Sequence, residues 1–326
     1  PRHRRRRVHR EQSSRLSGRL VDWGTHVRVL DNFSTGRREN LEDLAGNFEV
    51  VKADIRDPEA IRPAFEGVEF VLHQAAVPSV PRSVADPMTS HEANVTGTLN
   101  VLLAARDAGV RRVVIASSSS VYGDNHRLPK SEDMLPLPLS PYAASKVATE
   151  AYARAFRQVY GLETVCLRYF NVFGPKQDPA SQYAAVIPKF ITALLAGKRP
   201  TIFGDGEQTR DFTYMGNVVQ ANLLAVQAQG AAGGMFNIAC GQRTSLDDLV
   251  RILNELLGTD VEPVYEPARA CDGRSSGTGP RSRQRSTRRL VTCRDVPWRF
   301  RVATCRVGAY NGRHSMGLPI RGLPVR

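Results

Sequence analysis

Short runs of β-branched residues alternate with longer helical patterns through the centre of the chain, and this alternation constrains the fold more than any other feature. Buried strands are indicated by the runs at 26–31, 48–54, 68–76, 111–120 and 163–175. The longest helical patterns cover roughly 89–108 and 140–160, and Asp57 with Pro58 indicates a further helix start. Strands joined by crossover helices form a parallel sheet with helices on both faces. We therefore expect an α/β fold with a Rossmann-type, doubly wound parallel sheet.

Polar residues stand where these predicted strands end. They are Asp31, Asp54, the loop 74–76, the serines at 117–120 and Asn171. In an open parallel sheet, ligands bind beyond the carboxyl ends of the strands. We therefore expect these residues to line one site. Between about 173 and 268 the strand patterns shorten, which predicts a smaller α/β region that covers the site and binds substrate.

Tyr142 and Lys146 lie four residues apart within the predicted helix 140–160, so both side chains leave the same helix face. An ammonium beside a phenol stabilises the phenolate and lowers a pKa that is normally about 10. A tyrosine in that setting can act as a base near neutral pH. Ser118, at the end of the preceding strand, can relay a proton between a substrate hydroxyl and the phenolate. We therefore expect Ser118, Tyr142 and Lys146 to be catalytic.

Several motifs follow one another in the order known from one protein family: VLDNFSTGRRENL, HQAAVPSVPRS, SSSSVYGD, YAASK, RYFNVFGP, AAVIPKF and FGDGEQTRDFTY. Over residues 20–267 the chain resembles the extended short-chain dehydrogenase/reductases, specifically the NAD-dependent nucleotide-sugar epimerases and dehydratases. It is most similar to the bacterial UDP-glucose and UDP-N-acetylglucosamine 4-epimerases. The resemblance implies an NAD-binding Rossmann domain at 20–172 and a UDP-sugar-binding region at 173–268.

The resemblance also implies which residues hold the cofactor NAD. Asp31, at the end of the second strand of the family's fold, would accept hydrogen bonds from the adenosine ribose. Its charge favours NAD over NADP, because a 2′-phosphate would meet a like charge. Asp54 and Ile55 would flank the adenine. The full expected set is Asp31, Asn32, Ser34, Gly36, Asp54, Ile55, Gln74, Ala75, Ala76, Asn94, Ser117, Tyr142, Lys146, Tyr169 and Val172.

The substrate-binding residues are likewise implied by the resemblance. Arg210 matches the arginine that clamps the nucleotide diphosphate, and a planar guanidinium suits paired phosphate oxygens. Asn171 matches the asparagine after the strand on the nicotinamide side. The full expected set is Ser118, Ser119, Tyr142, Asn171, Val186, Phe203 and Arg210.

The residues after Ser118 favour one reaction of the family over others. The 4,6-dehydratases carry an Asp-Glu pair after the hydroxyl residue, whereas this chain has Ser119 and Ser120. We therefore expect 4-epimerisation of a UDP-hexose through a 4-keto intermediate, an isomerase reaction. The alternatives are decarboxylation of UDP-glucuronate, 4,6-dehydration, and a non-catalytic remnant of an enzyme. The sequence leaves open whether the sugar is N-acetylated.

The two ends of the chain differ in composition from its centre. Residues 1–23 carry a net charge of +6 and residues 269–326 a net charge of +12, whereas the remainder carries −5. The ends contain 22 arginines and no lysine, with no aromatic interleaving and no nucleic-acid-binding motif. We therefore expect no nucleic-acid partner despite the overall charge of +13.

Residues 2–13, RHRRRRVHREQS, stand where the resemblance places the glycine loop VTGGAGFIGSN, which holds the cofactor pyrophosphate. Codons for RHRRRRVHREQS can be chosen so that reading one base later gives this loop in full. We hypothesise a frame shift that alters residues 1–19 and another that alters 269–326. Arginine cannot replace the close backbone approach that glycine allows. We therefore predict that the polypeptide as written binds NAD poorly and is nearly inactive.

The remaining expectations concern partners and location. The five cysteines show no CxxC pair and no spacing typical of a metal site, so we expect no metal. The sequence shows no export signal and no apolar run of membrane-spanning length, so we expect a cytoplasmic protein. Relatives dimerise through two long helices, and we expect a homodimer through roughly 89–108 and 140–160.

Overall fold

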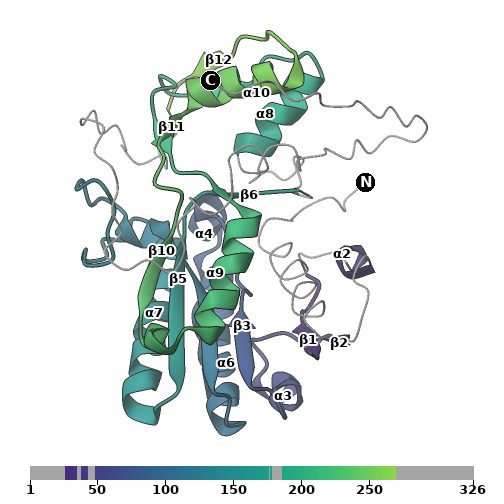
Figure 1. Cartoon of the computed structure of the whole chain (residues 1–326), viewed down its shortest axis with the longest axis vertical. Coiled ribbons are helices and arrows are strands. Elements are labelled where there is room, and N and C mark those ends of the chain that lie inside the picture. Colours follow the sequence, from purple (N-terminus) through teal and green to yellow (C-terminus); the bar gives the residue numbers. More distant parts are fainter. Residues whose placement is uncertain (1–25, 35–37, 43–47, 176, 178–185, 269–326) are drawn as a thin grey trace.

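The computed structural model describes residues 26–34, 38–42, 48–175, 177 and 186–268, and its centre is a parallel sheet. The strand order is β10-β5-β4-β3, in which all neighbours are parallel (Figure 1). The strands are β3 (Phe70–His73), β4 (Arg112–Ser118), β5 (Glu163–Tyr169) and β10 (Met235–Ile238). This arrangement confirms the expected Rossmann-type sheet.

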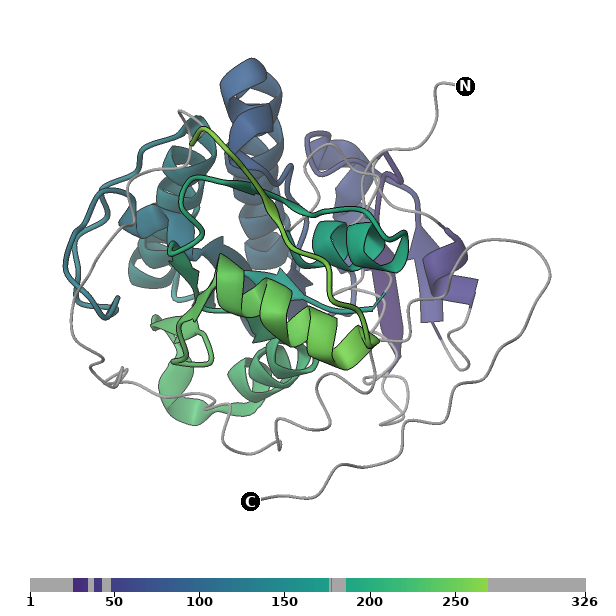
Figure 2. The same cartoon turned by 90° about the horizontal axis from the view of Figure 1, so that it is seen from above.

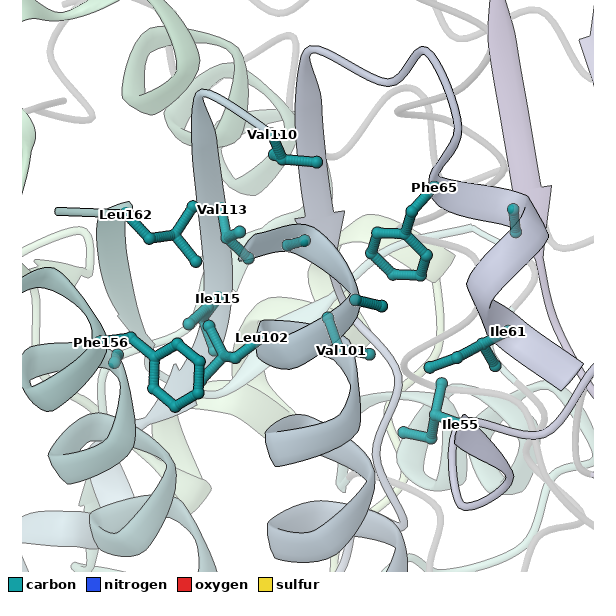
Figure 3. Close-up of a cluster of buried hydrophobic side chains, with 14 of the residues drawn as sticks. Ile55, Ile61, Phe65, Val101, Leu102, Val110, Val113, Ile115, Phe156 and Leu162 are labelled. Atoms are coloured by element: carbon teal, nitrogen blue, oxygen red, sulfur yellow. The ribbon is translucent and has the colours of Figure 1, made fainter. Parts of the chain in front are cut away.

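Helices cover both faces of this sheet, so it is doubly wound as predicted. The crossover helices are α6 (Gly97–Asp107), α7 (Pro141–Tyr160) and α9 (Met215–Gln227). In β4, Val113 and Ile115 pack into a core that includes residues of α6 and α7. Figure 3 shows this core, with Ile115 close to Leu102 and Phe156. The alternate β4 residues Val114 and Ala116 pack instead with residues of α9, because successive strand side chains point to opposite faces.

The helix α7 begins and ends where its sequence signals predict. The Ser140 side chain accepts a hydrogen bond from the backbone nitrogen of Ala143 over 3.1 Å, and Pro141 is the first helical residue. Gly161 ends the helix with a φ of 71°, a left-handed conformation that favours glycine. These signals fix the register of Tyr142 and Lys146 on the first turns of α7.

Asp57 caps the helix α3 (Pro58–Ile61) as its sequence predicts. Its side chain accepts from the backbone nitrogens of Glu59 and Ala60, both over 3.1 Å. The chain continues directly into the 3₁₀ helix η1 (Arg62–Phe65).

The strands β1 (Val27–Leu30) and β2 (Phe48–Val51) form a separate, parallel two-stranded sheet. Among the described residues, neither strand pairs with β3 or with any other strand of the large sheet. The Arg28 side chain joins this small sheet to the rest, because it donates to the carbonyl oxygens of Ala64 and Glu66 over 2.9 and 3.1 Å. A four-residue helix, α2 (Glu39–Glu42), lies between β1 and β2 in the sequence.

The helix predicted over roughly 89–108 is a compound element in the structure. It consists of α5 (Pro87–His91), a π-helical turn η2 (Glu92–Thr96) and α6, and α4 (Val80–Ala85) precedes it. Helical periodicity in a sequence does not reveal such a turn, which is common at functional sites. The turn carries Asn94, one of the expected cofactor residues.

A smaller part of the molecule lies beyond the carboxyl ends of the strands (Figures 1 and 2). The helices α8 (Val186–Leu195) and α10 (Leu246–Leu257) share a buried apolar cluster. Three short strand pairs also form here among the described residues. They are β6 (Val172–Phe173) with β9 (Thr213–Tyr214), β7 (Thr201–Phe203) with β12 (Val264–Glu266), and β8 (Thr209–Arg210) with β11 (Thr244–Ser245). Residues 173–268 build this part. They also supply β10 to the large sheet, and α9 and the short η4 (Gln229–Ala231), which pack against that sheet. Among the described helices, none is long and apolar enough to cross a membrane.

Candidate active site

The three residues expected to be catalytic come together where β4 meets α7. Ser118 is the last residue of β4, and its side chain lies close enough to Tyr142 to influence the pKa of the phenol. Tyr142 is 6% exposed and Lys146 is 3% exposed. The Lys146 ammonium nitrogen lies 5.9 Å from the centre of the Tyr142 ring and donates to the carbonyl oxygen of Ala116 over 2.8 Å. The structure thus assembles a phenol, a hydroxyl and an ammonium in one buried group.

Burial controls the charge of this group. It raises the pKa of Tyr142 to about 12, opposed by the nearby Ser118 side chain. It lowers the pKa of Lys146 to about 8, opposed by Cys166 and then by Glu150. The sequence predicts a lowered tyrosine pKa, and that prediction is wrong for the protein alone, because burial outweighs the nearby ammonium. A further charge beside the phenol is needed before Tyr142 can become an effective base.

Ser83 holds Tyr142 at the start of α7. Its hydroxyl oxygen, in α4, accepts from the backbone nitrogen of Tyr142 over 2.9 Å. Ser83 itself donates to the carbonyl oxygen of Val80 and is fully buried. Sequence reasoning missed this contact, because a serine within HQAAVPSVPRS is typical of many helices and carries no separate signal.

Three buried polar side chains, next to the ends of β3 and β5, are hydrogen-bonded to one another. The Tyr169 hydroxyl donates to the Gln74 side chain over 3.1 Å and accepts from the Asn222 amide over 2.8 Å. The Gln74 amide donates to the Asn222 side chain over 2.9 Å. Burial raises the pKa of Tyr169 to about 12, so this phenol stays neutral. Gln74 and Tyr169 are expected cofactor residues, whereas sequence reasoning missed Asn222 on α9.

Asn94 positions the loop that follows β3. Its side chain accepts from the backbone nitrogen of Val77 over 2.7 Å and donates to the Val77 carbonyl over 3.1 Å. It also donates to the Ser145 hydroxyl of α7 over 3.0 Å. Ala75 is exposed and Ala76 is partly exposed, so small side chains line this loop where a ligand can approach. Asn94 itself is buried, and it holds the backbone of this loop in place through its bonds to Val77.

The residues expected at the adenosine end of the cofactor lie after β1 and β2. The Asn32 amide donates to Asp54 Oδ2 over 2.7 Å, and Asp31 Oδ1 accepts from the backbone nitrogen of Phe33 over 2.7 Å. The backbone of Ser34, which is exposed, donates to Asn32 Oδ1 over 3.0 Å. Gly36, expected in the same pocket, lies outside the described residues.

Asp54 is strongly held in its charged form. The Arg56 side chain bonds to it over 2.9 Å, and this hydrogen bond lowers the pKa of Asp54 to about 2. A hollow of about 450 Å³ adjoins the pair, lined by Asp54, Arg56, Asp57, Glu92 and Thr96. The Ile55 side chain points the other way, into the core, where it packs against Gly97. Asp54 and Ile55 therefore face opposite environments.

Ser117 and Ser118 have different surroundings although they are neighbours in β4. The Ser117 hydroxyl is buried and donates to Glu150 Oε1 over 2.6 Å. Ser118 Oγ instead accepts from the Ser120 hydroxyl over 2.9 Å. The Ser117 side chain, expected at the cofactor, is thus committed to α7. Sequence reasoning missed Glu150, although it lies four residues after Lys146 on the same helix face.

The residues expected to bind substrate lie mainly in the smaller part of the molecule. Asn171, which is exposed, donates from its side chain to the carbonyl oxygen of Asp211 over 3.2 Å. Arg210 lies in β8, Phe203 ends β7 and Val186 begins α8, whereas Val172, which is expected at the cofactor, begins β6. Ser119 opens the 3₁₀ helix η3 (Ser119–Tyr122) directly after Ser118. Asn171 is therefore bonded to the residue that directly follows Arg210.

Asp211 is a residue that sequence reasoning missed. Its carboxylate accepts from the backbone nitrogens of Cys240 and Gly241 over 2.8 and 2.7 Å. Burial raises the pKa of Asp211 to about 6, opposed by these hydrogen bonds. The contact joins the chain next to Arg210 to the chain after β10, and so links the smaller part to the large sheet.

Comparisons with known proteins agree with this geometry. A family model described as the NAD dependent epimerase/dehydratase family matches residues 13–239. The UDP-glucose 4-epimerase of Mycolicibacterium smegmatis is 44% identical over 269 residues, which are 81% of this chain and 85% of that protein.

Two solved structures illustrate the similarity in three dimensions. The UDP-N-acetylglucosamine 4-epimerase from Methanobrevibacter ruminantium, in complex with UDP-N-acetylmuramic acid, superposes with a TM-score of 0.77 at 39% identity, covering 80% of this chain and 83% of that one. The UDP-glucose 4-epimerase of Thermus thermophilus, in complex with NAD, gives a TM-score of 0.72 at 36% identity, covering 80% and 84%. The fold, the placement of Ser118, Tyr142 and Lys146, and these matches lead to one conclusion: the chain belongs to the NAD-dependent epimerase/dehydratase family.

Proposed function

We propose that this protein is an isomerase that uses NAD to invert the configuration at C4 of a UDP-hexose. The observation that carries the proposal is the buried group of Ser118, Tyr142 and Lys146 at the end of β4. This group can accept one proton from a sugar hydroxyl and later return it. Similarity to 4-epimerases supports the choice of reaction.

The residues at the strand ends fit a dinucleotide. Asp31 offers a carboxylate after β1, the loop at Ala75 and Ala76 lacks bulky side chains, and Tyr142 with Lys146 lies at the other end. These residues would hold the adenosine ribose, the middle of the cofactor and the nicotinamide ribose, respectively. Oxidised NAD held by these residues would supply a hydride acceptor and a positive charge.

The chain's own residues handle the proton. Tyr142 takes the proton of the C4 hydroxyl, directly or through Ser118, while the C4 hydrogen leaves as hydride. The ammonium of Lys146 stabilises the phenolate form of Tyr142, which is the form that accepts this proton. After the 4-keto sugar turns over, Tyr142 returns the proton while the hydride re-enters on the opposite face of C4. No net oxidation results, so the products differ from the substrates only in configuration.

The arrangement after Ser118 favours epimerisation over dehydration. Elimination of water needs an additional acid and base near the sugar, and carboxyl groups provide these in the dehydratases. Here the position is taken by Ser119 and Ser120, and the Ser120 hydroxyl is hydrogen-bonded to Ser118. Neither serine can act as a carboxylate would.

We assign the nucleotide of the substrate to the smaller part of the molecule. Arg210 would bind the diphosphate through its guanidinium, and Phe203 with the start of α8 at Val186 would contact the uridine. Asn171 would bind the substrate at a point between this part and the catalytic group. The hydrogen bond of Asn171 to the Asp211 backbone supports this assignment, because it fixes Asn171 next to Arg210.

We also propose that the protein is a cytoplasmic homodimer, formed through α6 and α7. Supporting this, Tyr152 and Val159 of α7 are apolar or aromatic side chains with 36% and 69% exposure. Sedimentation analysis of the purified chain tests the dimer, with Val159→Glu as the disrupting variant. A monomer at all concentrations would exclude the dimer.

The decisive experiment uses two forms of the chain. One is the chain as written; the other, the restored chain, has VTGGAGFIGSN in place of residues 2–13 and the product of the gene's other reading frame in place of residues 269–326. Each is incubated with NAD and with UDP-galactose, UDP-N-acetylgalactosamine or UDP-glucuronate, and the products and the absorbance of bound cofactor are measured. We expect 4-epimerisation by the restored chain and almost none by the chain as written.

Other outcomes would change the conclusion. A 4-keto-6-deoxy sugar as product would show a dehydratase, and carbon dioxide released from UDP-glucuronate would show a decarboxylase. A restored chain that binds NAD but transforms none of these substrates would overturn the proposed function. The nucleotide sequence of the gene tests the frame-shift hypothesis, which fails if no reading frame encodes the glycine loop.

A further inference from the structure

An ion pair lies buried behind the catalytic group. Arg168 of β5 donates from Nε to Glu150 Oε1 and from Nη2 to Glu150 Oε2, both over 2.8 Å. The Arg168 side chain is 1% exposed and that of Glu150 is 6% exposed. Burying two charges carries a large desolvation cost, so such a pair is weak evidence for stability alone. Its contacts indicate a different role.

The ion pair is tied to β4 immediately before Ser118. Glu150 Oε1 also accepts from the Ser117 hydroxyl over 2.6 Å. One helical turn earlier, Lys146 donates to the carbonyl of Ala116 over 2.8 Å. Two successive residues of β4 are therefore bonded to two residues of α7 that lie four positions apart. These bonds set the register between β4, which carries Ser118, and α7, which carries Tyr142.

Arg168 also holds the chain that follows Ser118. Its Nη1 donates to the Tyr122 hydroxyl over 2.9 Å, and Tyr122 is the last residue of η3. The Tyr122 hydroxyl in turn donates to the Asn237 side chain of β10 over 2.7 Å. Ser118 is thus fixed from both sides: from Ser117 through Glu150, and from Tyr122 through Arg168.

Glu150 also supplies charge to the site. The groups that face Lys146 in the described residues include His73 of β3, Cys166 of β5, and Tyr142 and Glu150 of α7. Burial lowers the pKa of His73 to about 3 and raises the pKa of both Cys166 and Tyr142, so these three are neutral near pH 7. Near pH 7 Glu150 carries the negative charge in this set that favours the protonated form of Lys146, and the Arg168 guanidinium bonded to Glu150 offsets part of that charge.

We propose that Glu150, oriented by Arg168, is a positioning residue of the catalytic site. It fixes Ser118 against Tyr142 through Ser117, and it keeps Lys146 charged. This role presupposes the proposed reaction but not a particular sugar. Glu150 touches neither substrate nor cofactor in this scheme, and it acts through Ser117 and Lys146.

The kinetic test compares two buried hydroxyls. Ser117→Ala removes the bond between β4 and Glu150 but leaves the ion pair intact. The matched control is Thr164→Val, which removes a buried bond from β5 to the Ala153 carbonyl of α7, over 2.8 Å and away from Ser118. We expect Ser117→Ala to lower kcat about tenfold with an unchanged KM, because Ser118 is displaced by a fraction of an ångström. Thr164→Val should leave kcat unchanged. The measurement uses both the chain as written and the restored chain, with NAD added.

A second measurement needs no turnover. The full chain, labelled with ¹³C at lysine Cε, is titrated by NMR, and the Lys146 signal is assigned with Lys146→Arg. We expect Glu150→Gln to lower the pKa of Lys146, because the carboxylate charge is lost. Glu150→Asp keeps the charge and should leave the Lys146 titration in place, while the shorter side chain lowers kcat.

The outcomes separate this inference from the proposed function. If Ser117→Ala behaves as Thr164→Val does, or if Glu150→Gln leaves the Lys146 titration unchanged, the positioning role is wrong. If the Lys146 titration shifts as expected but no form of the parent chain epimerises a UDP-sugar, the proposed function fails instead. If Glu150→Gln does not fold, Glu150→Asp still tests the proposal. Its Lys146 titration reports the effect of the carboxylate charge, and its kcat reports the effect of the carboxylate position.

Discussion

Asn32 donates a hydrogen bond from its side-chain amide to Asp54 Oδ2 over 2.7 Å, and thereby joins the chain after β1 to the chain after β2. Asp31 precedes this contact, and its carboxylate accepts from the backbone of Phe33. The acidic groups expected at the adenosine ribose and the adenine are therefore held in one small polar cluster. Their position can be tested separately from the chemistry at Tyr142.

Asp31→Ala in the restored chain should weaken the binding of NAD about tenfold, because charged hydrogen bonds to the ribose hydroxyls are lost. The preference for NAD over NADP should fall as well, since the repulsion of a 2′-phosphate disappears. Titration calorimetry with both dinucleotides checks this prediction. Asp107→Ala is the control, because Asp107 lies at the end of α6 and pairs with Arg106 on the surface. Equal loss of affinity in both variants would contradict a ribose contact by Asp31.

Tyr142→Phe should lower kcat by roughly 10²- to 10⁴-fold, the usual contribution of a positioned acid–base group. Its affinity for UDP-sugar and its thermal stability should change little, because the ring remains in the same buried position. Tyr152→Phe provides the control, since Tyr152 lies on the same helix and is 36% exposed. Undiminished epimerisation by Tyr142→Phe would remove the basis of the mechanism.

Gly97→Ala should destabilise the protein by about 1–3 kcal/mol through overpacking. A Cβ at this position would lie 2.6 Å from both Cδ1 and Cγ1 of Ile55. Gly230→Ala is the matched control, because a Cβ there meets nothing within 4 Å. Urea unfolding of both variants measures the difference. The double variant Gly97→Ala/Ile55→Val should recover part of the loss, and failure to recover any would point to a backbone effect instead.

Acid should destabilise the fold through His73. This imidazole is buried and shares a 2.9 Å hydrogen bond with Thr98, and burial lowers the pKa of His73 to about 3 from 6.5. Between pH 6.5 and 3 the unfolded chain binds a proton that the folded chain does not, so stability falls as the pH falls. The slope from this one group is at most about 1.4 kcal/mol per pH unit. His73→Gln should flatten the dependence of the unfolding free energy on pH in this range. An unaltered slope would show that other groups cause the acid lability.

Local signals in the sequence predicted the elements that carry the catalytic group. Ser140 and Pro141 mark the start of α7, and the apolar run before Ser117 marks β4, so Tyr142 and Ser118 could be placed correctly. The strand predicted over 48–54 ends at Val51 in the structure, and a turn that begins at Asp54 follows it, in which the Asp54 carbonyl accepts from the Asp57 backbone nitrogen. The π-helical turn at Asn94 could not be predicted, since it keeps an ordinary helical pattern of apolar residues.

The polar contacts between distant segments were the harder part. Arg168 lies in β5, and the residues next to it in this strand are buried. Because a buried charge requires a partner, the sequence did contain a signal for an acidic residue such as Glu150. Nothing marked Asn222 or Ser83, because their roles depend on which helix faces which loop. The assignment of β10 to the large sheet also depended on topology, which sequence patterns after residue 173 did not reveal.

Among the described residues, the β1–β2 pair and the large sheet are separate sheets, and a dinucleotide would contact the ends of strands from both. Asp31 follows one sheet, and Ser118 follows the other. The second half of such a ligand binds at an effective concentration set by how well its two contact sites are held at the distance that the ligand spans. The ratio of the affinities for NAD and for AMP alone therefore measures how much the second site adds once the first is filled.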